Sequence, residues 1–207
     1  MVNQFNSQSV SLPFTDAAND ISGILVGNRI PKDFFETGGT GESDIAIHAG
    51  SYHLALKAAN IEMANIMTYS SILPGIAVRH EKPAKIEHGA VMESIMSVCT
   101  ANSGERASAG IIYGWLYNKQ TAEKYGGLVC EHYGSYTEEE LRKLLRLSLD
   151  ELYFNGFSDD FRMEHVHYLT QSFVPKKRYG TALVALCFTS YYHPIVRVEK
   201  KIQTSLQ

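Results

Sequence analysis

The sequence predicts an α+β protein built as a layered sandwich, and three observations support this fold class. Five apolar or alternating segments follow residue 89, and they are separated by Gly, Asn, Ser or charged residues, as is typical of strands. One segment in the same half has apolar residues at helical spacing. A second helical pattern with a face of small residues precedes it. Two helices and at least five strands in a mostly meandering order indicate helices packed on sheets.

The first third of the chain is expected to contain one short strand, a turn, a helix and a second strand. The short strand is expected near residues 24–26, after a polar arm rich in Ser and Asn. Glycines crowd residues 37–44, where a tight structural turn is the better expectation because the Gly-Lys-Ser/Thr ending of a phosphate loop is missing. The small-residue pattern predicts a helix over 46–59, and a strand over 61–68 should follow it.

The rest of the chain reads as strands interrupted by one strong helix. Thr137 and Glu140 form a Thr-x-x-Glu capping box, and leucines follow at helical spacing, so a helix should begin there. The expected strands cover residues 90–99, 109–117, 127–133, 165–173 and 181–188.

Composition excludes several classes of protein. A chain of 207 residues with 44% hydrophobic and 20% charged residues fits one soluble globular domain over residues 1–207. The net charge of −3 gives no basic field for nucleic acid. The three cysteines are far apart and form no CxxC, which fits a reducing compartment. No apolar stretch has spanning length and no signal peptide is recognisable, so we expect a cytoplasmic protein without a membrane partner.

Metal chemistry and simple hydrolysis are not expected. His48 and His53 are five residues apart, which does not place two ligands on one helix face. His165 and His167 alternate on a strand, but no third ligand accompanies them. The Gly-x-Ser-x-Gly elbow of a serine hydrolase is absent from the sequence.

The dipeptide Ser70-Ser71, at the end of the second expected strand, is the main chemical signal. The hydroxyl of Ser71 can attack the carbonyl of Ser70 and replace the peptide bond with an ester. Elimination then cuts the chain and leaves a dehydroalanine, which hydrolyses to a pyruvoyl group at a new N-terminus. A Ser-Ser pair in a turn is common, so the dipeptide alone does not establish this chemistry.

Two further residues have a functional and a structural interpretation, and the residues alone leave both open. Glu131 lies in an otherwise apolar or aromatic strand, where burial would raise its pKa and make it a proton donor, or it faces solvent. Asn65 either donates its amide to the oxyanion formed during attack by Ser71, or it caps a strand end.

Several segments together resemble the pyruvoyl-dependent arginine decarboxylase family, in particular its short bacterial members of the chlamydial type. The resemblance extends from about Phe34 to Phe188 with the segments in the right order. The segments that carry it are Thr37–Asp44, Ala59–Ile66, Tyr69–Pro74, His88–Glu93 and Gly127–Glu131.

The resemblance implies a four-layer αββα sandwich that cuts itself between Ser70 and Ser71. The products would be a small β subunit, 1–70, and a large α subunit, 71–207, that begins with a pyruvoyl group made from Ser71. This group would act without pyridoxal phosphate or metal, because its ketone condenses with a substrate amine and withdraws electrons. The implied reaction is decarboxylation of arginine to agmatine, a polyamine precursor, in trimers or dimers of trimers with active sites between subunits.

The resemblance also implies roles for individual residues. Asn65 would assist the cut, and Glu131 would protonate the carbanion left after carbon dioxide departs. The amino-acid substrate would lie beside His53, Ser70 and Ile72.

One position departs from the family pattern. Eighteen residues before the processed serine, members that use arginine carry an aspartate that holds the guanidinium, and here that position is His53. Either another carboxylate takes over, or the substrate is a different amino acid. The candidate carboxylates are Glu42, Asp44 and Glu62. A third alternative is a non-catalytic oligomeric homologue, against which the combination of Ser71, Asn65 and Glu131 argues.

Overall fold

The computed structural model describes residues 21–202, which fall into two compact units. The smaller unit pairs β1, Ile21–Val26, with β13, Ile195–Ile202, in an antiparallel arrangement. The backbone N–H of Gly27 donates to Pro194 O at 2.8 Å and extends this pairing. The strand expected near residues 24–26 is therefore confirmed. The larger unit, residues 30–192, carries every candidate site residue.

The larger unit contains two main sheets and one small ribbon. The five-stranded sheet has the order β4-β7-β11-β3-β6, with β4 Asn65–Thr68, β7 Val91–Asn102, β11 Tyr179–Phe188, β3 Asp33–Ser43 and β6 Val78–Arg79. The four-stranded sheet has the order β10-β8-β9-β5, with β10 Phe161–Phe173, β8 Ala107–Asn118, β9 Lys124–Gly134 and β5 Ile72–Pro74. The ribbon pairs β12, Tyr191–Tyr192, with β2, Ile30–Pro31. All five strands expected after residue 89 are confirmed.

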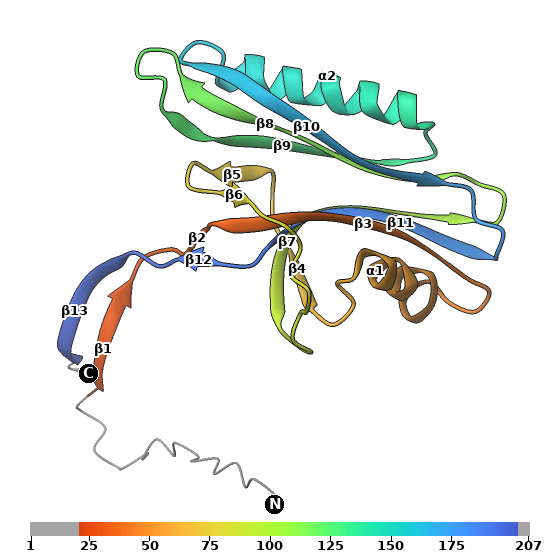
Figure 1. Ribbon diagram of the computed structural model, residues 1–207, viewed down its shortest axis with the longest axis horizontal. Helices are drawn as coiled ribbons and strands as arrows, with labels where there is room; N and C mark the ends of the chain where they lie inside the picture. The colour runs from red at the N-terminus through yellow and green to blue at the C-terminus, as the bar shows by residue number, and fades with distance from the viewer. Residues whose placement is uncertain (1–20, 203–207) are drawn as a thin grey trace, which may run out of the picture. The chain divides into compact units, whose positions relative to one another are not determined.

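Three apolar clusters hold the layers of this unit together. The first lies between the two sheets and includes Phe34, Tyr113 and Val129. A second joins the five-stranded sheet to α1, His53–Ala59, and a third joins the four-stranded sheet to α2, Glu138–Gly156. Figure 1 shows α2 over the four-stranded sheet and α1 against the other sheet. The predicted α+β layered sandwich is thus consistent with the structure.

The helix α2 begins as its sequence predicts. Thr137 Oγ1 accepts from the backbone N–H of Glu140, and Glu140 Oε2 accepts from the N–H of Thr137 at 2.8 Å. These reciprocal bonds satisfy donors that a helix start leaves without partners. The leucines on one face of the helix are fully buried against the four-stranded sheet; they are Leu141, Leu145 and Leu149.

The expectation of a turn at residues 37–44 is wrong, because this glycine-rich stretch forms most of β3. A Cβ on Gly39 would lie 2.4 Å from Ala55 O, and one on Gly41 would lie 2.3 Å from Ser51 O. The glycines therefore let the following helical segment pack directly on the strand backbone. That segment matches the helix predicted over 46–59, but its first part, Ile47–Tyr52 (η1), is a π-helical turn that leads into α1.

The strand expected over 61–68 is shorter than predicted. Residues 61–64 form a turn, with Ala64 N–H donating to Ile61 O at 3.2 Å, so that β4 begins only at Asn65. Within residues 21–202, neither helix is both long and apolar enough to cross a membrane.

Candidate functional site

The Ser70-Ser71 bond spans the space between the two sheets. On its upstream side, the backbone N–H of Tyr69 donates to Ser94 O at 2.8 Å and continues the parallel pairing of β4 with β7. On its downstream side, the carbonyl of Ser71 accepts from Val129 N–H at 3.0 Å and leads into the pairing of β5 with β9. The chain therefore passes from one sheet to the other within this dipeptide.

The carbonyl of Ser70 has a hydrogen-bond donor of its own. The backbone N–H of Ile72 donates to Ser70 O at 3.0 Å, which closes a three-residue turn centred on Ser71. A donor in this place polarises the carbonyl and would stabilise negative charge on its oxygen. Sequence reasoning missed it, because a backbone amide leaves no signature in residue types.

Glu131 lies beside the serine. Ser71 Oγ donates to Glu131 Oε2 at 3.2 Å, and the carboxyl is half-buried. Burial raises the pKa of Glu131, while the hydrogen bond from Ser71 acts in the opposite direction. Val129, two residues earlier on the same face of β9, belongs to the core between the sheets. Glu131 is thus half-buried and does not simply face solvent, and its role as a proton donor stays a prediction.

Cys130, the neighbour of Glu131 in sequence, faces the other way. Its side chain packs with the cluster under α2, and burial together with the Glu131 charge raises the pKa of its thiol to about 11. A thiol in this environment stays protonated at neutral pH, so Cys130 fills space in the layer below α2.

Asn65 secures the start of β4. Its Nδ2 donates to Gly89 O at 3.0 Å, and its backbone N–H donates to Ala90 O at 2.8 Å. These contacts correspond to the strand-end role considered from the sequence. A role of Asn65 in assisting the cut stays a prediction.

His53 is not brought to Ser71 within one chain. It is exposed at the start of α1, whose main contacts are with β3, β11 and η1 on the outer face of the five-stranded sheet. Ser71 is bound instead to β9 in the other sheet. Within one chain, His53 and Ser71 therefore belong to elements packed on different sheets.

The three carboxylates considered as replacements for the missing aspartate also lie away from the serine pair. Glu42 Oε1 accepts from Lys176 N–H at 2.7 Å, and Asp44 Oδ1 accepts from Arg178 N–H at 3.1 Å. Both therefore bind the connection between β10 and β11. Glu62 lies in the turn between α1 and β4.

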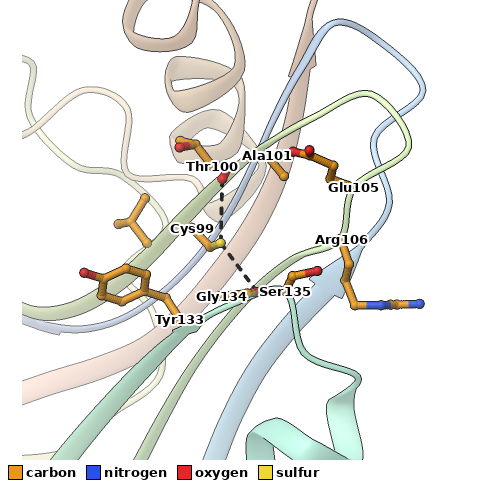
Figure 2. Close-up of a pocket in the computed structure, with 9 residues that line it drawn as sticks. Cys99, Thr100, Ala101, Glu105, Arg106, Tyr133, Gly134 and Ser135 are labelled. Carbon is orange, nitrogen blue, oxygen red and sulfur yellow. Dashed lines mark hydrogen bonds between the residues drawn. The ribbon is translucent and has the colours of Figure 1, made fainter.

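A cavity of about 600 Å³ lies farther along β7 and β9 (Figure 2). Cys99 Sγ lies in it, 3.6 Å from Gly134 O, and the charged side chains of Glu105 and Arg106 stand at its rim. Glu131 does not line this cavity, although Tyr133, two residues later on the same strand, does. Among residues 21–202, no group of three His, Cys, Asp or Glu side chains could hold a metal ion.

Comparison with known proteins identifies the family. The model of the pyruvoyl-dependent arginine decarboxylase family matches residues 33–193. The chain is 29% identical over 186 residues to pyruvoyl-dependent arginine decarboxylase AaxB of Chlamydia trachomatis serovar D, covering 80% of this chain and 94% of that protein. Identity to AaxB of Chlamydia abortus is 30% with the same coverage. Pyruvoyl-dependent arginine decarboxylase 2 of Methanosarcina mazei is 32% identical over 115 residues, 54% of this chain and 60% of that protein.

These findings place the chain among enzymes that remove a carboxyl group. It belongs to the pyruvoyl-dependent arginine decarboxylase family, and its cofactor is a covalently bound pyruvoyl group, not pyridoxal phosphate. The residues present fit such a group, because a serine hydroxyl with a half-buried carboxyl beside it follows a carbonyl that already accepts a hydrogen bond.

Proposed function

We propose that the chain cuts itself between Ser70 and Ser71 and then decarboxylates an amino acid with the pyruvoyl group made from Ser71. The observation that carries this proposal is the contact of Ser71 Oγ with Glu131 Oε2 at 3.2 Å. The donor at Ser70 O supports it, because attack on a carbonyl needs a place for the negative charge.

The cut begins with the hydroxyl of Ser71 and ends with the pyruvoyl group. Ser71 Oγ attacks the carbonyl carbon of Ser70 and transfers its proton to Glu131, which passes a proton to the departing nitrogen of Ser71. The peptide bond is then an ester. Loss of the Ser71 α-proton expels the Ser70 carboxylate and leaves a dehydroalanine. Its imine form takes up one water, releases ammonia and leaves the pyruvoyl group.

In the decarboxylation, the pyruvoyl ketone supplies a carbonyl that withdraws electrons from the bond to the substrate carboxylate. Glu131 holds a proton on its carboxyl group and delivers it to the α-carbon once carbon dioxide has left. Burial suits Glu131 to this task, because a raised pKa keeps more of the carboxyl protonated near neutral pH. The same carboxyl thus serves as base during the cut and as acid during turnover.

Arginine is the substrate that we place first, with agmatine as product. The relatives are named as arginine decarboxylases. His53 weighs against it, because an imidazole cannot form the bidentate pair that a carboxylate forms with guanidinium, and losing one partner of such a buried pair costs about 3 kcal/mol. The second candidate is therefore the same reaction on an amino acid without a guanidinium group. The family match favours either enzyme over a non-catalytic homologue.

The substrate is tested by incubating processed protein with each of the twenty amino acids and measuring the amine released. Agmatine from arginine is the expected result. Release of another amine, with none from arginine, would overturn the arginine proposal. If residue 53 sets specificity, His53→Asp raises kcat/KM for arginine about 100-fold. The control is His48→Asp, a change at an exposed histidine nearby, which should leave kcat/KM unchanged.

The cut is tested by denaturing electrophoresis of freshly purified protein. Two fragments of about 7 and 15 kDa are expected, sizes that follow from average residue masses. Ser71→Ala should give one uncut chain that does not react with hydrazine reagents. Ser70→Ala is the matched control, because it keeps the nucleophile and should still be cut. An uncut native chain would contradict the proposal.

A trimer of processed chains is part of this proposal. Apolar side chains are exposed on the edge strands β4 and β5, on the part of β9 beyond its pairing with β5, and at the start of β7; they are Met67, Ile72, Tyr133 and Val91. Covering such a group by another copy removes apolar surface from water. In such an assembly, the proposed contact of His53 with substrate would come from a neighbouring copy. Sedimentation equilibrium checks the assembly: a trimer or a multiple of it is expected, and a monomer at micromolar concentration would exclude it.

A further inference from the structure

Immediately upstream of the serine pair, a tyrosine is attached to a buried carboxyl group. Tyr69 Oη donates to Glu93 Oε2, and Glu93, on β7, is only 2% exposed. The Tyr69 ring contacts Phe188 with 5.6 Å between ring centroids, and its backbone N–H is bound to Ser94 O. Three independent contacts therefore fix this residue, one position before Ser70.

We infer that Tyr69 and Glu93 are positioning residues for the cut between Ser70 and Ser71. Their effect acts through the backbone that precedes this bond. They hold the upstream side of the bond against the five-stranded sheet, while the hydrogen bond from Val129 to the Ser71 carbonyl holds the downstream side against the other sheet. The inference rests on the proposed self-cleavage and adds two residues that have no assigned role in the sequence pattern.

The geometry of the attack explains why such fixation matters. Ser71 Oγ must approach the carbonyl carbon of Ser70. This approach requires particular torsion angles about the backbone bonds on either side of the Ser70-Ser71 peptide. Only Ser70 separates the two fixed residues, so few backbone rotations are free to move the carbonyl away from the hydroxyl. Pre-orientation of this kind contributes strongly to rate, and a displacement of about 1 Å can cost about 100-fold.

The burial of Glu93 supports a directional role for the pair. Placing a carboxyl group in the space between two sheets carries a desolvation cost, whereas an apolar residue in this place would carry none. The ring of Tyr69 could pack against Phe188 without its hydroxyl. What the hydrogen bond adds to packing is a fixed direction for the tyrosine side chain, and hence for the backbone that precedes the bond to be cut.

The test compares rates of self-cleavage after cell-free synthesis, followed on denaturing gels. Tyr69→Phe keeps the ring and removes Oη, so the cut should be about tenfold slower, and Glu93→Leu should slow it similarly. Glu93→Gln keeps an oxygen acceptor and should stay within about threefold of the native rate. If the two residues act as a pair, the double variant with Tyr69→Phe and Glu93→Leu should cut itself no more slowly than either single variant. Tyr125→Phe, at an exposed tyrosine, is the control.

Two further measurements separate positioning from a general loss of structure. Hydroxylamine cleaves the ester, so the rate at which it cuts the chain reports attack by Ser71, and it should fall in Tyr69→Phe by the same factor as self-cleavage. Melting temperatures are measured with each change placed in the uncut Ser71→Ala chain. The differences in melting temperature between Glu93→Gln and Tyr69→Phe should not parallel the differences in their cleavage rates.

The outcomes distinguish this inference from the proposal on which it rests. An uncut native chain overturns both. A native chain that cuts, together with a Tyr69→Phe chain that cuts equally fast, overturns only the positioning role. Slowing that follows the melting temperature, with no rescue in Glu93→Gln, also overturns it.

Discussion

Ser71 Oγ and Glu131 Oε2 lie 3.2 Å apart although the two residues are 60 positions apart in the sequence. The contact exists because β5 pairs with β9, with Ile72 opposite Leu128. This pairing places Ser71, the residue before β5, beside Glu131. A change at Glu131 should therefore affect both the formation of the cofactor and its use.

We predict that Glu131→Gln loses decarboxylation by a factor of about 100 to 10,000, the usual contribution of a positioned proton donor. An amide cannot deliver a proton to the α-carbon. The measurement is kcat on protein that has been fully cut, because slower self-cleavage would otherwise lower the apparent activity. Full kcat in cut Glu131→Gln protein would exclude Glu131 as the acid.

The raised pKa of Glu131 also predicts a pH dependence of stability. The folded chain binds a proton more tightly than the unfolded chain, whose carboxyl has its ordinary value of 4.5. The folded state is therefore favoured at low pH and loses this advantage as pH rises from 4.5 through the folded pKa. When both proteins are fully cut, Glu131→Gln should melt at a higher temperature than the native protein at neutral pH and show no gain below pH 4. Equal melting temperatures at all pH values would contradict the buried position of Glu131.

Gly39→Ala should destabilise the fold by about 1–3 kcal/mol, as overpacking does. The new Cβ would lie 2.4 Å from Ala55 O and 2.7 Å from Ala59 N, so α1 would have to move off β3. Gly156→Ala is the matched control, because nothing lies within 4 Å of a Cβ there. Denaturant unfolding of both variants checks the prediction, and equal midpoints would refute the close approach.

Tyr113→Phe should cost about 1–3 kcal/mol, because it leaves a carboxyl without one of its donors. Tyr113 is 2% exposed and donates to Glu36, which also pairs with Arg79 at 3.2 Å. Burial is the larger cause of a raised pKa of Tyr113, and the hydrogen bond to Glu36 adds to it, so the hydroxyl stays protonated and remains a donor. Tyr125→Phe, at an exposed site, should change the unfolding free energy by less than about 0.5 kcal/mol.

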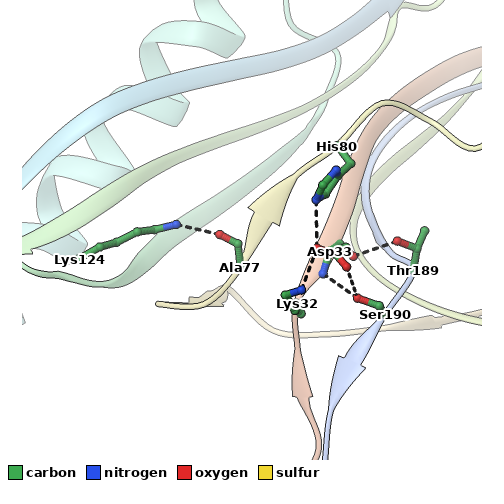
Figure 3. A network of polar contacts seen from close by, with 7 residues as sticks. All are labelled: Lys32, Asp33, Ala77, His80, Lys124, Thr189 and Ser190. Carbon is green, nitrogen blue, oxygen red and sulfur yellow. Dashed lines mark hydrogen bonds and ion pairs between the residues drawn. The ribbon is translucent and has the colours of Figure 1, made fainter.

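Asp33 should stabilise the fold at neutral pH and lose this effect in acid. The hydrogen bond from Ser190, with the nearby Lys32 and His80, lowers the pKa of Asp33 below its ordinary value of 3.8 (Figure 3). Stability from this group is present above pH 3.8 and is lost as pH falls through the folded pKa. Asp33→Asn should therefore be less stable at pH 7 by up to about 1 kcal/mol, and the difference should shrink towards pH 3. Thermal melts against Asp159→Asn, an exposed control, measure it.

Much of the fold could be predicted because local sequence patterns identify most of its strands and α2. The strands β7 to β11 are apolar runs between polar breaks, and α2 has both a capping box and a leucine face. The glycine-rich β3 could not be predicted in this way. Its glycines serve the close approach of Ala55 and Ser51, which a local pattern does not reveal.

The site could be predicted in its residue types but not in its contacts. Ser71 and Glu131 were identifiable, because one carries nucleophile chemistry and the other is an acid in an apolar strand. The hydrogen bond of Asn65 to Gly89 and that of Tyr69 to Glu93 each join residues 24 positions apart, and both depend on the parallel pairing of β4 with β7. Pairing between distant strands is set by the whole sheet, so the sequence near these residues does not contain it.

The order of the five-stranded sheet has a consequence for refolding. Strands from both sides of the proposed cut are interleaved within it: β4 and β3 precede Ser71, and β7, β11 and β6 follow it. A cut would leave two chains that cannot separate without opening the sheet. It would also turn folding into a second-order reaction, since two molecules must then meet to rebuild what one chain had formed alone. Recovery of the processed protein from denaturant should depend on its concentration, whereas recovery of Ser71→Ala should not.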